Sequence, residues 1–476
     1  MHKYLLFLIF LFPFMTVEGQ VSLDSCRSMA VRNNKTIKMA EENLISAGRY
    51  REAAKAAYLP GIDFTATYLY NQHVINLLGE DAKLPTMSFD PSTGSYQYNL
   101  VKNEQGIPVK DPSTGSYIPS EVAVIPKEAM SYDIHNVFAG AITLTQPVYM
   151  GGQIRALNEI AGYGEQLAKA MKNNLSQEIV YAVDEAYWTV ISLKEKEKLA
   201  RSFVNVVDTL LYNVNAMLEE GVATRSDLLS VEVRYNEAMI ALTKVENGVS
   251  LSRMALAQLC GLPIDSQIVL EDEQLKYPQL PVMLAPVDME NVYSRRQDLE
   301  IVRQSINMLE GKEKLALGEM LPKVAIIGAY GFSNPNVIDG FEKRFGGGFH
   351  VGATITVPIW HWGGDYKKYK AARSTTSAQR YLLEDLEEKV QLQVAQARFK
   401  FEEARKTYDM TVLNMKKADE NLRQAQLGFK EGMLTTNDVL MAQTAWLAAN
   451  SEKIDAEISV RLCKTYLDKV TGRLGI

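Results

Sequence analysis

Hydrophobic and polar residues alternate in four separate stretches of the chain, which is the pattern of a β-strand with one apolar face. The stretches span residues 61–70, 137–149, 323–332 and 349–360. In the second, for example, Ile142 and Leu144 alternate with Thr143 and Thr145. About ten residues is also the length of a tilted strand that crosses a bilayer. The pattern therefore fits either a membrane-spanning sheet or a soluble antiparallel sheet with one buried face.

Aromatic residues gather at both ends of these stretches. The six at the loop-proximal ends are Tyr68, Tyr70, Phe138, Tyr330, Phe332 and Phe349. At the other ends lie Trp360 and Trp362, together with Tyr149. Tryptophan and tyrosine are enriched where a membrane meets water, so two clusters at opposite strand ends predict aromatic belts at two interfaces.

Two much longer segments carry a narrow apolar stripe with spacings of three and four residues. They span 153–220 and 366–431, and neither Arg155 to Glu220 nor Tyr366 to Glu431 contains a proline. A narrow, sustained stripe is typical of coiled-coil seams. A helix of this length would be about 100 Å long at ~1.5 Å per residue.

Such helices need partners along their whole length. Residues 224–260 and 435–472 are also helical in pattern, and we expect them to return antiparallel to the long helices. Residues 24–57 and 287–318 predict one further helix before the first strand of each half.

The chain repeats itself at a constant offset of 211 residues (432 − 221). Gly221, Thr224 and Asp227 match Gly432, Thr435 and Asp438, and Pro147 matches Pro358 at the same offset. This predicts an internal duplication. We assign the first repeat to residues 20–270, a linker to 271–286 and the second repeat to 287–476.

The first repeat carries an insertion at 71–135 that is rich in Pro, Gly, Ser and Asn. It contains the sequence Asp-Pro-Ser-Thr-Gly-Ser-Tyr twice, at 90–96 and 111–117. This composition predicts a long surface loop built from turns. Its short counterpart ends in a glycine triplet, 346–348, which we also expect to be loop.

The two repeated turns have a structural explanation. Gly221 and Gly432 end the long helices, where a residue that tolerates positive φ is needed. Thr224 and Thr435 can cap the next helices, and Asp227 and Asp438 lie three residues further on, as in a capping box. Capping alone explains these residues, and a function at the tips in addition to capping stays open.

Composition limits the binding partners and chemical activities that we expect of the chain. Lys+Arg 51 against Asp+Glu 57 gives a net charge of −6, which provides no reason to expect nucleic acid as a partner. The chain has no zinc or phosphate-binding motif and no set of nucleophile, base and orienting residue, so we expect no enzyme activity, metal or cofactor. His361 fits an interfacial or packing role. Cys26, Cys260 and Cys463 form no disulfide framework and fit helix packing.

Residues 1–19 read as a signal peptide, because a short apolar run follows His2 and Lys3 and ends near Gly19. A retained N-terminal anchor is the alternative. Cys26 lies too far beyond the apolar run for lipoprotein acylation. No stretch reaches about 18 consecutive apolar residues, so a polytopic helical membrane protein is excluded.

Four strands cannot close a barrel, because an open edge in lipid leaves backbone groups unpaired. Several chains must therefore share one barrel. Two copies would give eight strands and a largely filled interior, whereas three would give twelve strands and a lumen.

The duplicated order of helix, Leu-Pro, strand, loop, strand, Gly-Gly, long helix and Gly-x-x-Thr-x-x-Asp resembles that of the TolC-like outer-membrane efflux and secretion channels. The resemblance implies an α+β membrane protein, in which an antiparallel α-helical coiled-coil barrel continues a transmembrane β-barrel shared by a homotrimer. It also implies an exit duct in the outer membrane of a Gram-negative bacterium that extends into the periplasm. A periplasmic adaptor, or another exported coiled-coil structural protein, is the alternative.

By this resemblance, a periplasmic adaptor (membrane fusion protein) and an inner-membrane pump would be partners. The adaptor-docking tips would comprise Gly221, Val222, Thr224, Gly432, Met433, Leu434 and Thr435. Asp227 and Asp438 would lie at the periplasmic entrance, where rings of carboxylates favour cations. A second acidic position one turn later is occupied by Met441, which departs from some members of the family. The 71–135 loop would face the cell exterior.

Overall fold

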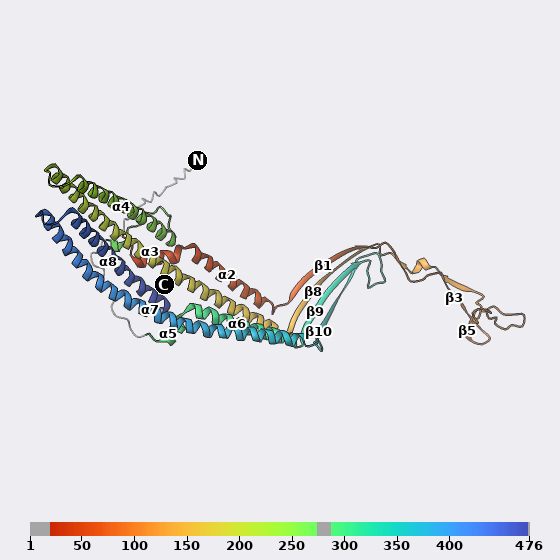
Figure 1. Ribbon diagram of the computed structural model, residues 1–476. Coiled ribbons are helices and arrows are strands. Elements are labelled where there is room, and N and C mark those ends of the chain that lie inside the picture. Colours follow the sequence, from red (N-terminus) through yellow and green to blue (C-terminus); the bar gives the residue numbers. More distant parts are fainter. Residues whose placement is uncertain (1–19, 274–286, 475–476) are drawn as a thin grey trace, which may run out of the picture. The chain divides into compact units, whose positions relative to one another are not determined.

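The computed structural model describes residues 20–273 and 287–474. The predicted signal peptide and most of the predicted linker lie outside the described residues. The chain divides into two compact units. The sheet unit contains residues 55–154 and 317–365, and the helical unit contains the rest of the described chain (Figure 1).

Four long helices dominate the helical unit. They are α3 (Gln153–Glu219), α4 (Arg225–Leu259), α7 (Gly364–Lys430) and α8 (Thr436–Val470). α3 and α7 each have 67 residues, and α4 and α8 each have 35. α3 turns back into α4, and α7 turns back into α8 (Figure 1). Within the described ranges, no helix is both long enough and apolar enough to cross a membrane.

The segments predicted as single helices at 24–57 and 287–318 are each broken in two, so this prediction was wrong. The helices are α1 (Leu23–Asn33), α2 (Lys35–Ala56), α5 (Met289–Arg295) and α6 (Gln297–Gly318). The residues between them are extended, with ψ of 126° at Asn34 and 116° at Arg296.

Both breaks have the same physical cause. The side-chain amide of Asn34 donates to the carbonyl oxygen of Leu259 at 2.9 Å, and the Arg296 guanidinium donates to that of Val470 at 3.1 Å. These carbonyls belong to the last residues of α4 and α8. The C-terminal carbonyls of a helix have no partner within the helix, so each break supplies a donor to the end of another helix.

Residues 20–34, which we call the N-terminal strap, lie against α3 and the end of α4. Arg27 pairs with the fully buried carboxylate of Asp184. At the start of the strap, Val21 bonds through its backbone to Val269 and Glu271, and Glu271 begins a short 3-10 turn, η2 (Glu271–Glu273). Contact with Asp184 raises the pKa of Arg27, whereas burial raises the pKa of Asp184 despite the neighbouring guanidinium. Loss of solvation therefore outweighs ion pairing at the acid.

The sheet unit contains one four-stranded antiparallel sheet. Its strands are β1 (Gly61–Tyr70), β8 (Asn136–Met150), β9 (Lys323–Asn334) and β10 (Gly346–Thr356), in that order across the sheet (Figure 1). Among the described residues, β1 pairs only with β8 and β10 only with β9, which leaves one free edge on each outer strand. β10 ends before the predicted residue 360, because Pro358 cannot donate a ladder hydrogen bond.

The strand register places most of the large apolar residues of the four strands on one face, although Leu69, Val137 and Ile327 lie on the other. Ile62 is opposite Leu144, and Phe64 is opposite Ile142. The row continues across β9 and β10, where Ile142 is opposite Tyr330 and Tyr330 is opposite Phe349. Directly opposed residues in an antiparallel pair share a face. The other face carries Asp63, Thr65, Thr67, Thr143, Thr145, Ser333, His350, Thr354 and Thr356.

The glycine triplet 346–348 forms the start of β10, so its prediction as loop was wrong. Gly347 is opposite Phe332 in the ladder. A Cβ atom at Gly347 would lie 2.7 Å from the carbonyl oxygen of Gly331 and 2.9 Å from the hydroxyl of Tyr330. The triplet therefore allows close strand approach.

Residues 71–135 form an arm with more strand structure than the predicted turns. Its three ladders pair β2 (Ile75–Asn76) with β7 (Ser131–Tyr132), β3 (Ala82–Pro85) with β6 (Val122–Ile125), and β4 (Met87–Asp90) with β5 (Ser95–Tyr98); a 3-10 turn, η1 (Lys127–Met130), precedes β7. In the two copies of the repeated heptapeptide, Asp90 accepts from the backbone of Ser92, and Asp111 accepts from that of Ser113, both at 2.9 Å. These bonds are Asx-turns.

The buried ion pair of the strap provides a stability test. Arg27→Ala leaves the Asp184 carboxylate buried without its partner, so we expect a loss of about 3 kcal/mol in the free energy of unfolding. The double variant Arg27→Ala/Asp184→Ala should lose less than the sum of the two single variants. Chemical denaturation followed by circular dichroism measures both. Additive losses would contradict a direct interaction.

Candidate functional site

The two tips of the helical unit, where α3 turns into α4 and α7 turns into α8, have the same backbone structure. Gly221 has φ of 75° and Gly432 has φ of 72°. The next residue in each tip donates back to the preceding helix: Val222 to the carbonyl oxygen of Met217 at 2.8 Å, and Met433 to that of Gly428 at 2.7 Å. This arrangement satisfies helix C-terminal carbonyls and requires a positive φ at the glycine.

Each tip then enters its second helix through a complete capping box. The Asp227 carboxylate accepts from the backbone amide of Thr224 at 2.9 Å and from its hydroxyl at 2.6 Å. In return, the Thr224 hydroxyl oxygen accepts from the backbone amide of Asp227 at 3.2 Å. Thr435 and Asp438 form the same three bonds at 2.8, 2.7 and 3.3 Å.

The capping boxes also change the pKa of the two aspartates. Hydrogen bonds from the threonine hydroxyl and backbone lower the pKa of both Asp227 and Asp438. A depressed pKa keeps a carboxylate ionised to lower pH than usual. Both tips therefore carry a fixed negative charge throughout the neutral range. Each aspartate contacts its own threonine.

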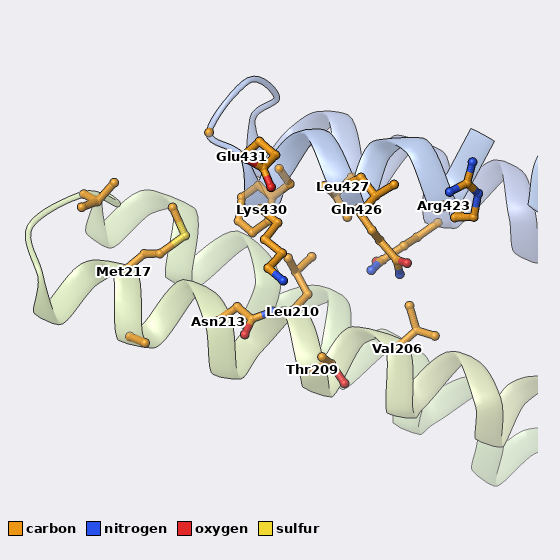
Figure 2. A pocket seen from close by; sticks show the side chains of 16 residues that line it. Val206, Thr209, Leu210, Asn213, Met217, Arg423, Gln426, Leu427, Lys430 and Glu431 are labelled. Atoms are coloured by element: carbon orange, nitrogen blue, oxygen red, sulfur yellow. The ribbon is translucent and has the colours of Figure 1, made fainter. Parts of the chain in front are cut away.

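A cleft of about 880 Å³ lies beside the tips, between α3 and α7 (Figure 2). Side chains of Leu210 and Asn213 on α3 line one wall, and those of Leu427 and Lys430 on α7 line the other. Val222 and Gly432, from the two predicted docking tips, line it too. The structure thus joins parts of both tips in one concave surface, although the other five predicted docking residues do not line it: Gly221, Thr224, Met433, Leu434 and Thr435.

Gln443 of α8 lines the same cleft and was not predicted from the sequence. Its side chain is 1% exposed, and neither its amide nitrogen nor its amide oxygen has a hydrogen-bond partner among the described residues. Buried polar groups are nearly always paired. In a helical sequence, a glutamine that faces the core cannot be distinguished from one that faces solvent, so the sequence contains no signal for Gln443.

The predicted aromatic belt residues lie on or next to the sheet. Tyr68 packs on Phe138 with ring centroids 4.8 Å apart, and Phe64 stacks on Phe332 at 6.4 Å. Phe349 on the edge strand β10 is 82% exposed. Trp360 and Trp362 follow β10 instead of belonging to it, and their rings meet edge to face at 5.9 Å.

The model of the outer membrane efflux protein family matches residues 119–262 and 289–473, which together make up more than half of the chain. The chain belongs to the outer membrane efflux protein family. The predicted resemblance to TolC-like channels is therefore confirmed, as is location in the outer membrane of a Gram-negative bacterium.

Two members of this outer membrane efflux family resemble the chain in sequence. It is 22% identical over 335 residues to the outer membrane efflux protein BepC of Brucella suis biovar 1, strain 1330, covering 70% of this chain and 72% of BepC. It is 20% identical over 338 residues to the alkaline protease secretion protein AprF of Pseudomonas aeruginosa, covering 68% of this chain and 67% of AprF.

The fold is that of solved outer-membrane channels. The CmeC outer membrane channel of Campylobacter jejuni superposes with a TM-score of 0.69 and 15% identity, covering 95% of this chain and 86% of CmeC. Membership in this family disfavours the alternative of a periplasmic adaptor. Within residues 20–273 and 287–474, no cluster of three or more His, Cys, Asp or Glu residues could hold a metal ion.

The capping box gives a local prediction. Thr435→Ala removes the hydroxyl that accepts from the Asp438 amide, so amide hydrogens in the first turn of α8 should exchange about fivefold faster. Thr435→Ser keeps the hydroxyl and serves as the control. Hydrogen–deuterium exchange with mass spectrometry measures both. Equal exchange in the two variants would mean that the hydroxyl does not stabilise the start of α8.

Proposed function

We propose that the protein is the exit duct of a tripartite efflux or type I secretion system. It assembles as a homotrimer in the outer membrane and passively exports small molecules or proteins that an inner-membrane pump delivers. The observation that carries this proposal is the four-stranded sheet with one continuous apolar face and two free edges.

The free edges require other copies of the chain. In lipid, each unpaired backbone group costs several kcal/mol, so β1 and β10 must pair with neighbours. β1 of one copy would then pair with β10 of the next. Three copies give twelve strands, which is enough to enclose a lumen, whereas the eight strands of a dimer would be largely filled by side chains.

The two faces of the sheet suit lipid outside and water inside. On the apolar face, Val351 and Ile355 of β10 are 73% and 66% exposed, like the neighbouring Phe349. The opposite face carries the threonines and His350. The aromatic residues at the strand ends would form the interfacial belts.

The helical unit also exposes apolar residues that a second chain would cover. Large apolar side chains on the outside of α7 include Leu392, Phe399, Met410 and Leu413, and those on α4 include Val233, Ile240 and Leu251. Long coiled-coil helices bury such stripes against neighbours. Three copies of α3, α4, α7 and α8 would thus continue the lumen into the periplasm as a helical barrel.

The repeated local structures support an origin by duplication. The strap break at Asn34 and the break at Arg296 are 262 positions apart, and the helix ends that they cap, Leu259 and Val470, are 211 apart. The same offset of 211 relates the linkers that precede α3 and α7. Gly151-Gly152 and Trp362-Gly363 both have positive φ, so Trp362 stands where the first repeat has glycine.

We further propose that the tips dock a periplasmic adaptor. Val222 and Met433 are 71% and 75% exposed at the ends of the two hairpins, where a docked partner could cover them. The cleft between the tips offers both apolar surface, at Leu427, and polar groups, at Asn213 and Lys430, to a partner. The arm at 71–135, at the opposite ends of the strands, would face the cell exterior.

The names of the two relatives indicate two classes of cargo. BepC is named for efflux and AprF for secretion of a protease, and the chain has nearly equal identity to both. A passive duct need not recognise its cargo, so either class fits.

The lipid-facing assignment is tested by adjacent residues of β8. Ile142→Lys places a charge in lipid and should destabilise the barrel by about 2–4 kcal/mol, so that little trimer reaches the outer membrane. Thr143→Lys, on the lumen face, is the matched control and should assemble normally. Membrane fractionation and native electrophoresis in detergent measure assembly. The reverse order of effects, or a wild-type protein recovered as a soluble monomer without detergent, would refute the proposed duct.

The entrance assignment is tested by charge reversal. Asp227→Lys combined with Asp438→Lys should shift the selectivity of the purified channel from cations toward anions in planar bilayers. In the wild type, cation preference should persist below the usual carboxyl range and be lost only as pH falls through the depressed pKa of these acids. Glu220→Lys, which reverses a charge at an exposed position of the same tip as Asp227, is the control. Unchanged selectivity in the double variant would mean that both acids act only as helix caps.

A further inference from the structure

Two cysteines that are 234 positions apart in sequence meet in the core of the helical unit. Cys26 belongs to α1 in the N-terminal strap, and Cys260 caps the C-terminal end of α4. The Cys260 thiol donates a hydrogen bond to the carbonyl oxygen of Cys26, with Sγ and O 3.7 Å apart. Both residues are fully buried in the cluster that also contains Val183 and Tyr187.

The two thiols also lie close enough to influence each other's ionisation. A hydrogen bond between the side chains, together with burial, raises the pKa of Cys26 well above its usual value. The third cysteine, Cys463, lies on α8, is only partly buried and packs against a different cluster, with Phe401 and Val460. The structure therefore distinguishes one adjacent pair from one isolated thiol.

We propose that Cys26 and Cys260 are a modification site, where they form an intramolecular disulfide that fastens the N-terminal strap to the end of α4. The oxidant would be a protein disulfide of the periplasmic thiol-oxidising class. One thiolate attacks that disulfide to give a mixed disulfide, and the second thiolate then displaces the oxidant. The S–S bond forms, and two electrons and two protons leave with the oxidant as its dithiol.

The compartment favours this reaction. Outer-membrane proteins cross the periplasm, which is kept oxidising, and adjacent cysteines in exported proteins commonly form disulfides. The proposal thus rests on outer-membrane location and on the contact between the two residues. It does not depend on the proposed channel activity.

Burial determines when the bond can form. The reactive species is the thiolate, and the packed site disfavours ionisation of Cys26 and excludes an oxidising protein. Oxidation must therefore precede or accompany docking of the strap. Once formed, the bond would be protected from reductants by the same packing.

The strap has the contacts of an element that benefits from such a bond. α1 has only 11 residues, and it is held by the Arg27–Asp184 pair, by the Asn34 bond to Leu259 and by the backbone bonds of Val21. Short terminal segments open by local fluctuation more easily than long packed helices. A disulfide in the middle of the strap would prevent complete release even when the other contacts open.

Counting free thiols in the exported wild-type protein tests the proposal without relying on a variant that must fold. The full-length chain is expressed in a Gram-negative host with intact thiol-oxidising enzymes, and cells are quenched in acid. The protein is then denatured and treated with a polyethylene glycol maleimide, which adds a visible mass to each free thiol. We expect one adduct per chain without reduction, at Cys463, and three after reduction.

Three variants identify the paired residues. Cys463→Ser should give no adduct without reduction and two after it. Cys26→Ser and Cys260→Ser should each give two adducts without reduction, because the remaining partner becomes free. Three adducts in the unreduced wild type would overturn the proposal. Two adducts in unreduced Cys463→Ser would also overturn it, because only Cys26 and Cys260 remain in that variant and both would then be free thiols.

Discussion

The structure depends on one constraint, which is that backbone hydrogen bonds cannot be left open in lipid. The sheet β1-β8-β9-β10 presents a continuous apolar face, yet its outer strands each retain a free edge. A soluble protein would cover that face with its own helices, but Phe349, Val351 and Ile355 are all largely exposed. In the proposed duct, other copies of the chain pair the edges and lipid covers the face. These two requirements are the basis of the proposed trimer.

The helical unit must also satisfy backbone groups, at the ends of its helices. A long helix leaves carbonyl and amide groups unpaired at its termini. Capping boxes at Thr224 and Thr435 satisfy the starts of α4 and α8, and the side chains of Asn34 and Arg296 reach carbonyls at their ends. These four local structures hold the hairpins at both ends. The tips can therefore expose apolar residues such as Val222 and Met433 without fraying.

Periodicity and turn chemistry were enough to predict the class of each long element, because these features depend on local sequence, and the order of those elements carried the resemblance to the family. The capping partners of Asp227 and Asp438 were predicted for the same reason. The breaks at Asn34 and Arg296 were missed, since each depends on a carbonyl more than a hundred residues away. The contact of Cys26 with Cys260 and the unpaired amide of Gln443 also arise from tertiary packing. The positive φ of 54° at Trp362 was also missed, because this conformation is one that glycine adopts far more readily than tryptophan.

The central claim, that one face of the sheet meets lipid and the other meets water, can be measured along β10 by nitroxide labels at positions 349, 350, 351 and 352 in a Cys463→Ser background. In reconstituted bilayers, labels replacing Phe349 and Val351 should be relaxed by oxygen dissolved in lipid. Those replacing His350 and Gly352 should respond to a water-soluble nickel complex. Shielding of positions 349 and 351 from both reagents would show that protein covers the apolar face, which would contradict its contact with lipid.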